Sequence, residues 1–174
     1  MEQKNQVWIV MGSDSDLKVM SEAAQILDQF RVSYKISVAS AHRSTDYALE
    51  QARTAASSGI KVIIAGAGLA AHLPGVLAAA TTLPVIGVPL QSGPLAGQDA
   101  LYAIVQMPPG IPVATVGINA ARNAGLLALQ ILAIQDEELA KILTEYRLNM
   151  QKEVIAKDTK LQELGYVDYL KEKK

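Results

Sequence analysis

Short apolar runs recur along this chain and predict strands. The runs Val7–Met11 and Lys61–Ala65 are almost wholly apolar, which is typical of strands buried on both faces of a parallel sheet. Three further stretches have the same character. The five predicted strands are Val7–Met11, Ser33–Val38, Lys61–Ala65, Pro84–Val88 and Val113–Val116.

Helical periodicity separates these runs. Leu17, Met20, Ala24 and Leu27 recur at three- and four-residue spacing, and Gly59 stands where a helix usually ends. The predicted helices are Asp16–Phe30, Ser44–Ser58, Leu73–Ala80, Gln98–Gln106 and Asn119–Ile134, followed from Asp136 by a charged amphipathic helix or pair of helices. Strands that alternate with helices indicate an α/β fold, a three-layer αβα sandwich with a central parallel sheet, flavodoxin-like or Rossmann-like.

Length and composition limit the possibilities. The 174 residues, 50% of them hydrophobic, fit one domain and not two. Sixteen basic and seventeen acidic residues create no basic field, so we expect neither nucleic acid nor a membrane surface as a partner. The absence of cysteine excludes thiolate chemistry, and two histidines leave few ligands for a metal. The first residues do not resemble a signal peptide, so we expect a cytoplasmic protein.

Charge is distributed unevenly. Residues 60–135 contain only Lys61, Asp99 and Arg122 as charged residues, whereas residues 136–174 contain seventeen. A membrane span does not explain the contrast, because four prolines between residues 74 and 94 divide the uncharged stretch into pieces too short to cross a bilayer. The helix Asn119–Ile134 is apolar almost all round, which indicates burial on every side. We therefore expect a homo-oligomer with extensive apolar interfaces.

A loop segment follows each of the first three predicted strands: the polar Gly12–Asp16 and Ser40–Arg43, and the glycine-rich Gly66–His72. The carboxyl ends of parallel strands meet at one edge of a sheet, where ligands bind. Gly12–Asp16 opens a helix, whose free amides attract anions, although a simple turn with an N-cap has the same composition. It is not a Walker P-loop, because no Gly-Lys-Ser/Thr follows.

Both histidines lie in these segments. His42 offers a titratable base beside Arg43, a cation that can hold phosphate or carboxylate through two hydrogen bonds. A surface histidine that caps a helix is the structural alternative. His72 lies in an apolar stretch and fits a structural role as well as a catalytic one.

Gly66–Ala71 matches the dinucleotide fingerprint G-x-G-x-x-A. That fingerprint also needs an acidic residue about 20 positions later, and the first acid after Gly66 is Asp99. Pro74 also interrupts the helix that should follow. The sequence thus disfavours a nicotinamide cofactor. A receiver module is disfavoured too, because the third strand ends without a phosphoacceptor aspartate.

Longer motifs carry a resemblance to a family. The segments GSDSD, SAHRSTD, AGAGLAAHLPG, PVIGVPL, AIVQMPPGIPVAT and NAGLLALQIL, in this order, resemble the N5-carboxyaminoimidazole ribonucleotide mutases of de novo purine (IMP) biosynthesis over nearly the whole chain. The related animal-type carboxylases have lysine at the position of Arg43 and lack AHLPG, so the resemblance is to the mutase class. Leu69 stands where this family usually has glycine, and GINAARNAG lacks the lysine-glycine element of many bacterial members.

The resemblance implies an isomerase that needs no cofactor or metal. It would move a carboxylate from the exocyclic nitrogen of the ribonucleotide to ring carbon 4, by decarboxylation and recarboxylation, with His42 as general acid and base. The residues implied to bind the substrate are Ser13, Ser15, Ser40 and Arg43 at the phosphate, Asp16 at the ribose, and Ala67, Gly68 and Leu73 at the reacting end, with His72 also among them.

The resemblance also implies an assembly. Members of this class form homo-octamers in which a C-terminal helical extension, here residues 136–174, packs on a neighbouring subunit, while residues 1–135 form the α/β catalytic part of the same domain. The alternative is direct carboxylation of aminoimidazole ribonucleotide with carbon dioxide. A Rossmann protein that binds NAD and a non-catalytic flavodoxin-like module are the less favoured alternatives.

Overall fold

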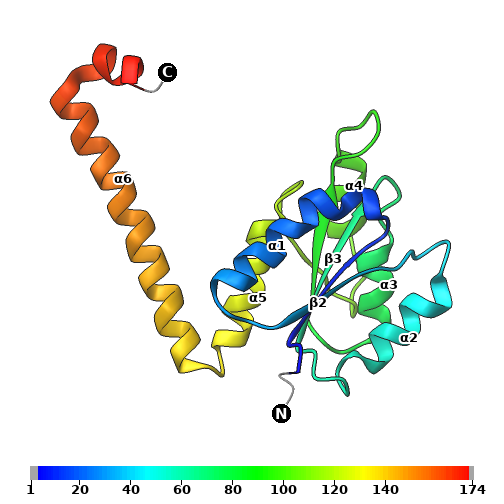
Figure 1. Cartoon of the computed structure of the whole chain (residues 1–174). Helices are drawn as coiled ribbons and strands as arrows, with labels where there is room; N and C mark the ends of the chain where they lie inside the picture. Colours follow the sequence, from blue (N-terminus) through cyan, green and yellow to red (C-terminus); the bar gives the residue numbers. More distant parts are fainter. Residues whose placement is uncertain (1–3, 173–174) are drawn as a thin grey trace.

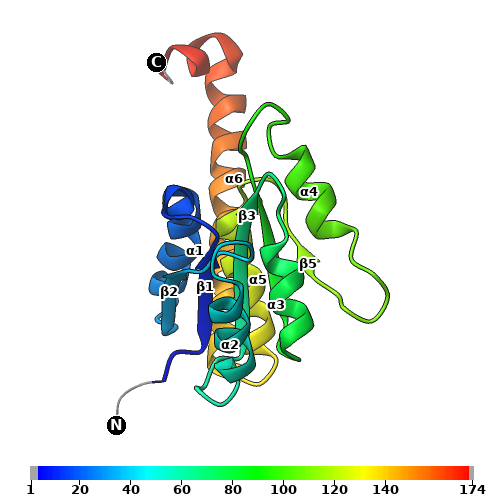
Figure 2. The ribbon, with the colours of Figure 1, turned by 90° about the vertical axis from the view of Figure 1, so that its right-hand side faces the viewer.

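A computed structural model describes residues 4–172. It contains one five-stranded parallel sheet. The strands are β1 (Val7–Met11), β2 (Tyr34–Val38), β3 (Val62–Gly68), β4 (Val85–Leu90) and β5 (Ala114–Thr115). They lie in the order β2-β1-β3-β4-β5, which can be followed from left to right in Figure 2. The predicted α/β sandwich is confirmed. Of the two predicted topologies, this strand order is the flavodoxin-like one and not the Rossmann one.

Helices cover both faces of the sheet (Figure 1). Residues of α1 (Leu17–Gln29) and α5 (Ala121–Ala133) share one hydrophobic core with one face. Residues of α2 (Thr45–Ala55), α3 (Leu73–Ala80) and α4 (Gln98–Val105) share a second core with the other face. Alternate residues of β1 serve the two cores, with Ile9 in the first and Trp8 and Val10 in the second, because successive side chains of a strand point to opposite faces.

The strands β3 and β5 differ most in length from their predictions, while β2 and β4 differ by one residue each. β3 continues to Gly68 and not only to Ala65, because it pairs with β4 as far as Gly68 opposite Leu90. β5 contains only Ala114–Thr115, where the sequence predicted four residues, because β4 pairs with it at just two positions. The longer β3 carries its glycine-rich end up to the edge where the predicted site lies.

The helices α1 and α5 approach each other closely at Gly125. A Cβ atom added at Gly125 would lie 2.2 Å from Cγ2 of Ile26 and 3.1 Å from the carbonyl oxygen of Ala23. Only glycine fits between these atoms, and it therefore sets the distance between the two helices.

Ser13 and the short 3₁₀ turn Asp14–Asp16 lead from β1 into α1.

The single tryptophan connects β1 to the edge strand β2. Trp8 is fully buried, and its Nε1 donates a hydrogen bond to Oγ of Ser37 at 2.7 Å. The ammonium of Lys35 lies 4.4 Å from the centroid of the indole ring, and burial lowers the pKa of this lysine. Side chains thus reinforce the pairing of the edge strand.

The helix α6 (Glu137–Glu172) extends away from the α/β body (Figure 1). Gly165, at φ 70°, divides it into two helices, which selects the helix pair from the two predicted alternatives. Its buried residues are Leu139 and Leu143, and its exposed large apolar residues are Ile142, Leu148, Met150, Val154, Ile155, Leu164, Tyr166, Val167 and Leu170. The helix ends at Glu172, and residues 173–174 lie outside the described part.

Within one chain, α5 is buried on one side only. Ala124 and Leu129 are fully buried, but Leu126 and Leu127 on the other side are half-buried and Ile134 after the helix is 81% exposed. The predicted burial on every side is therefore not met by this chain alone. Across residues 4–172, no helix is both long enough and apolar enough to cross a membrane.

Candidate active site

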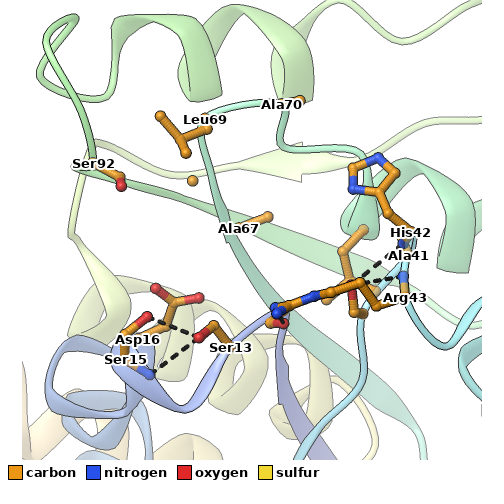
Figure 3. A pocket seen from close by; sticks show the side chains of 14 residues that line it. Ser13, Ser15, Asp16, Ala41, His42, Arg43, Ala67, Leu69, Ala70 and Ser92 are labelled. Atoms are coloured by element: carbon orange, nitrogen blue, oxygen red, sulfur yellow. Dashed lines mark hydrogen bonds between the residues drawn. The ribbon is translucent and has the colours of Figure 1, made fainter.

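A pocket of about 320 Å³ lies at the carboxyl ends of the strands (Figure 3). The three loop segments predicted to converge do so here, joined by the loop after β4. The residues that line the pocket are Gly12, Ser13, Ser15, Asp16, Ser40, Ala41, His42, Arg43, Ala67, Gly68, Leu69, Ala70, Leu73 and Ser92. Every site residue predicted from the sequence lines the pocket except His72, which contacts the lining residue His42.

The first wall follows β1. The hydroxyl oxygen of Ser13 accepts hydrogen bonds from the backbone N–H of Ser15, at 3.4 Å, and from its hydroxyl, at 2.9 Å. The N–H of Gly12 donates to the carbonyl oxygen of Gly66 at 3.3 Å, which fixes this turn against the end of β3. Hydroxyls and helix-starting amides together make a polar wall suited to an anion.

Asp16 adds a carboxylate to this wall. Burial raises its pKa above the ordinary value of 3.8, and the neighbouring charge of Asp14 raises it further, while hydrogen bonds from Ser13 and Ser15 oppose the shift. The carboxylate oxygens can accept hydrogen bonds from hydroxyl groups of a ligand. The hydroxyl groups of a sugar next to a bound anion would suit this carboxylate.

The second wall follows β2 and is held by Ser40. Its hydroxyl oxygen accepts hydrogen bonds from the backbone N–H groups of His42, at 3.3 Å, and Arg43, at 3.1 Å. The Nη2 of Arg43 donates to the carbonyl oxygen of Gly12 at 3.3 Å, so the guanidinium connects the first wall to the second. The serine therefore holds the turn that presents the base and the cation to the pocket.

The two histidines contact each other. Nε2 of His42 and Nδ1 of His72 are 2.8 Å apart, and the ring planes make an angle of 76°. One ring must donate and the other accept, so His72 fixes the orientation of the His42 ring. Both side chains are exposed in this chain. The sequence placed these residues at one edge but did not predict this hydrogen bond.

The third wall consists of the last residues of β3 and the loop after it, and it is apolar. Ala67, Gly68 and Ala70 present little more than backbone, and Leu73 at the start of α3 is 2% exposed. Leu69 has φ 52°, in the left-handed region that favours glycine, and its side chain is 49% exposed. This wall therefore offers no side-chain hydrogen-bond donor or acceptor to a ligand.

The pocket lining also contains residues that the sequence did not predict. Ser92 belongs to the loop after β4, which reaches the same edge as the other three loops. Polar Gln91 and Ser92 directly follow an apolar strand, and this signal could have identified them. Gly12, Ala41, Leu69 and Ala70 were also missed as individual lining residues. Over the described residues 4–172, no three His, Cys, Asp or Glu side chains group together as metal ligands would.

Comparisons with known proteins show which family the chain resembles. The family model described as AIR carboxylase matches residues 6–153. The N5-carboxyaminoimidazole ribonucleotide mutase of Pyrococcus abyssi is 59% identical over 164 residues, which cover 94% of each chain. The phosphoribosylaminoimidazole carboxylase of Schizosaccharomyces pombe is 53% identical over 94% of this chain, which spans 30% of that longer protein. A crystal structure of Treponema denticola PurE superposes with a TM-score of 0.83 at 30% identity, over 90% of this chain and 98% of that one.

Proposed function

The chain belongs to the AIR carboxylase family, and on that premise we propose that it converts N5-carboxyaminoimidazole ribonucleotide to 4-carboxy-5-aminoimidazole ribonucleotide in purine biosynthesis. AIR denotes aminoimidazole ribonucleotide. The observation that carries the proposal is the placement of His42, Arg43 and Asp16 around one pocket, beside an apolar wall. These groups supply a base, a cation and a hydroxyl acceptor, as a ribonucleotide that exchanges a carboxylate requires.

The substrate phosphate would lie between the first two walls. Arg43 can donate two parallel hydrogen bonds to phosphate oxygens, and its contact with Gly12 directs it to this end of the pocket. The hydroxyls of Ser13, Ser15 and Ser40 would complete the phosphate site, and Asp16 would accept from the ribose hydroxyls. The base would then extend toward Ala67, Gly68 and Leu73, with His42 alongside.

The reaction needs one proton to move twice. In the first step the carbamate C–N bond breaks, its electron pair stays on the exocyclic nitrogen, and protonated His42 donates a proton to that nitrogen. Carbon 4 then attacks the released carbon dioxide, a C–C bond forms, and neutral His42 removes the proton from carbon 4. One group serves both steps, so no net proton enters or leaves. The apolar wall excludes water while the gas molecule is free.

Direct carboxylation remains the alternative reaction. The chain has arginine, not lysine, at position 43 and contains the AHLPG segment, both of which favour the mutase. The names of the full-length bacterial and archaeal relatives favour it as well. The fungal carboxylases cover this chain with less than a third of their own length, so their name describes a larger protein.

A homo-octamer in the cytoplasm is part of the proposal. The exposed apolar side chains of α6 and the half-covered α5 support it, because an isolated chain would leave both in water. In such an assembly residues 136–174 would pack on a neighbouring subunit.

Isotope retention tests the reaction. Substrate labelled with ¹³C in the carbamate, turned over in unlabelled bicarbonate without ATP or metal, should give product that keeps most of the label. The control is aminoimidazole ribonucleotide with bicarbonate, which should react far more slowly. Extensive loss of label, or a rate with the control that matches the carbamate, would support the carboxylase instead.

A further inference from the structure

We propose that the side chain of Leu69 covers the reacting end of the pocket and retains carbon dioxide there between the two bond changes. The inference rests on the proposed function and adds to it a residue that controls how often the intermediate escapes. Four observations carry it: the backbone conformation of Leu69, its exposure, its position in the pocket and its contact with the loop after β4.

The backbone of Leu69 is in a conformation that leucine avoids. At φ 52° its Cβ is crowded by its own backbone, and glycine adopts this conformation without that conflict. The turn from β3 into α3 requires a left-handed residue here. The backbone of a leucine at this position is therefore strained, and the turn conformation sets the direction in which its side chain leaves the backbone.

That side chain is the largest apolar group exposed to the pocket. Among the described lining residues, Leu73 is of equal size but 2% exposed, and the others are small or polar. In Figure 3, Leu69 lies across the pocket from Ser13 and Asp16, the residues assigned to the phosphate and ribose. It therefore stands at the end where the ring and its carboxylate would lie.

Leu69 also reaches the loop of residues 91–97. A Cβ atom added at Gly93 would lie 2.7 Å from Cδ2 of Leu69, so the leucine packs directly on the backbone of that loop. Ser92 of the same loop lines the pocket. The leucine thus fills the space between the third wall and this loop, and a glycine at position 69 would leave that space open.

Carbon dioxide is small, uncharged and without hydrogen-bond donors, so an apolar cover holds it by shape alone. Recapture by carbon 4 competes with diffusion out of the pocket, and covering the exit favours recapture. Removing the cover should change this competition and leave C–N cleavage nearly unaltered, because Leu69 offers no group that donates or accepts a proton.

The test compares Leu69→Gly, Leu69→Ala and Leu69→Met in the full-length chain. We expect the glycine variant to unfold at the same or a higher temperature than the parent, since its backbone strain is relieved. Its ¹³C retention should fall, with free aminoimidazole ribonucleotide released roughly tenfold more often per carbamate consumed. The alanine variant should behave similarly, and methionine should keep parental retention because it restores apolar bulk.

Leu95 provides a matched control. It is an apolar residue of the same loop, 58% exposed, and is not among the residues that line the pocket. Leu95→Ala should therefore retain label as the parent does. Parental retention in both Leu69→Gly and Leu69→Ala would overturn the inference while leaving the mutase reaction in place. A parent enzyme that cannot convert the carbamate would overturn the proposed function and the inference with it.

Discussion

Replacing His42 with asparagine should abolish most turnover while preserving the fold. Asparagine keeps the backbone N–H that donates to Ser40 and similar size, but it cannot carry a proton between the exocyclic nitrogen and carbon 4. General acid–base catalysis typically contributes about 10²–10⁴-fold, which is about 2.7 to 5.5 kcal/mol of activation free energy. Both chemical steps use this group, so we expect the upper part of that range.

The structural cost should be much smaller than the catalytic one. The His42 side chain is exposed, and the hydrogen bond to His72 is its one side-chain hydrogen bond among the described residues. Losing such a bond costs about 1 kcal/mol. The free energy of unfolding should therefore fall by about that amount at most, and the Michaelis constant should stay within a few-fold because Arg43 and the serines still hold the phosphate.

The assay follows carbamate consumption and product formation at saturating substrate, beside urea unfolding of the same preparations. His72→Asn is the matched control, since it removes the hydrogen bond between the two histidines but keeps the His42 imidazole that carries the proton. It should lose far less activity than the His42 variant. A His42→Asn enzyme that retains a tenth or more of parental kcat, by this order-of-magnitude reasoning, would refute the acid–base assignment.

Three further predictions concern Arg43, Asp16 and the C-terminal helix α6. Arg43→Lys should raise the Michaelis constant roughly tenfold with little change in kcat, because one ammonium cannot replace the forked guanidinium, and an unchanged constant would move the phosphate site elsewhere. Because burial raises the pKa of Asp16, its carboxylate opposes folding increasingly as the pH rises from 3.8 through that pKa. Asp16→Asn should thus equal or exceed the parent in urea stability at pH 7, lose that advantage toward pH 3.8, and bind substrate less tightly, whereas an advantage that grows on acidification would contradict the reasoning. Deleting residues 151–174 should lower the mass of the assembly measured by light scattering. An unchanged, stable assembly would count against packing of the C-terminal extension on a neighbouring subunit.

The sequence predicted the element order because apolar runs and helical stripes are local signals. It could not predict strand length, since β3 reaches Gly68 only through pairing with β4. The choice between flavodoxin-like and Rossmann-like order also depends on which strands pair, and no local pattern encodes that choice. The N5-carboxyaminoimidazole ribonucleotide mutase resemblance, by contrast, rested on long motifs, and the family match together with the names of the relatives confirms it.

The site was predictable wherever a polar segment directly follows a strand. The contact between His42 and His72 was not, because it depends on how far each loop rises above the sheet. Met11 is level with Val38 on one side and with Gly66 on the other, and this register brings the two loops to the same height. For Leu69 the resemblance indicated an unusual residue, but its positive φ and its contact with Gly93 required coordinates.

The environment of Trp8 gives this protein a built-in optical probe. With one indole in the chain, all tryptophan emission reports a single location, the junction of β1 and β2. In the folded chain the ring is shielded from water, so unfolding should shift its emission maximum to longer wavelength. Ser37→Ala removes the hydroxyl that accepts from the indole, and Lys35→Met removes the ammonium beside the ring, so each variant should change the folded spectrum in its own way. Loosening of the edge strand therefore becomes visible in ordinary fluorescence, separately from events in the pocket at the other end of β1.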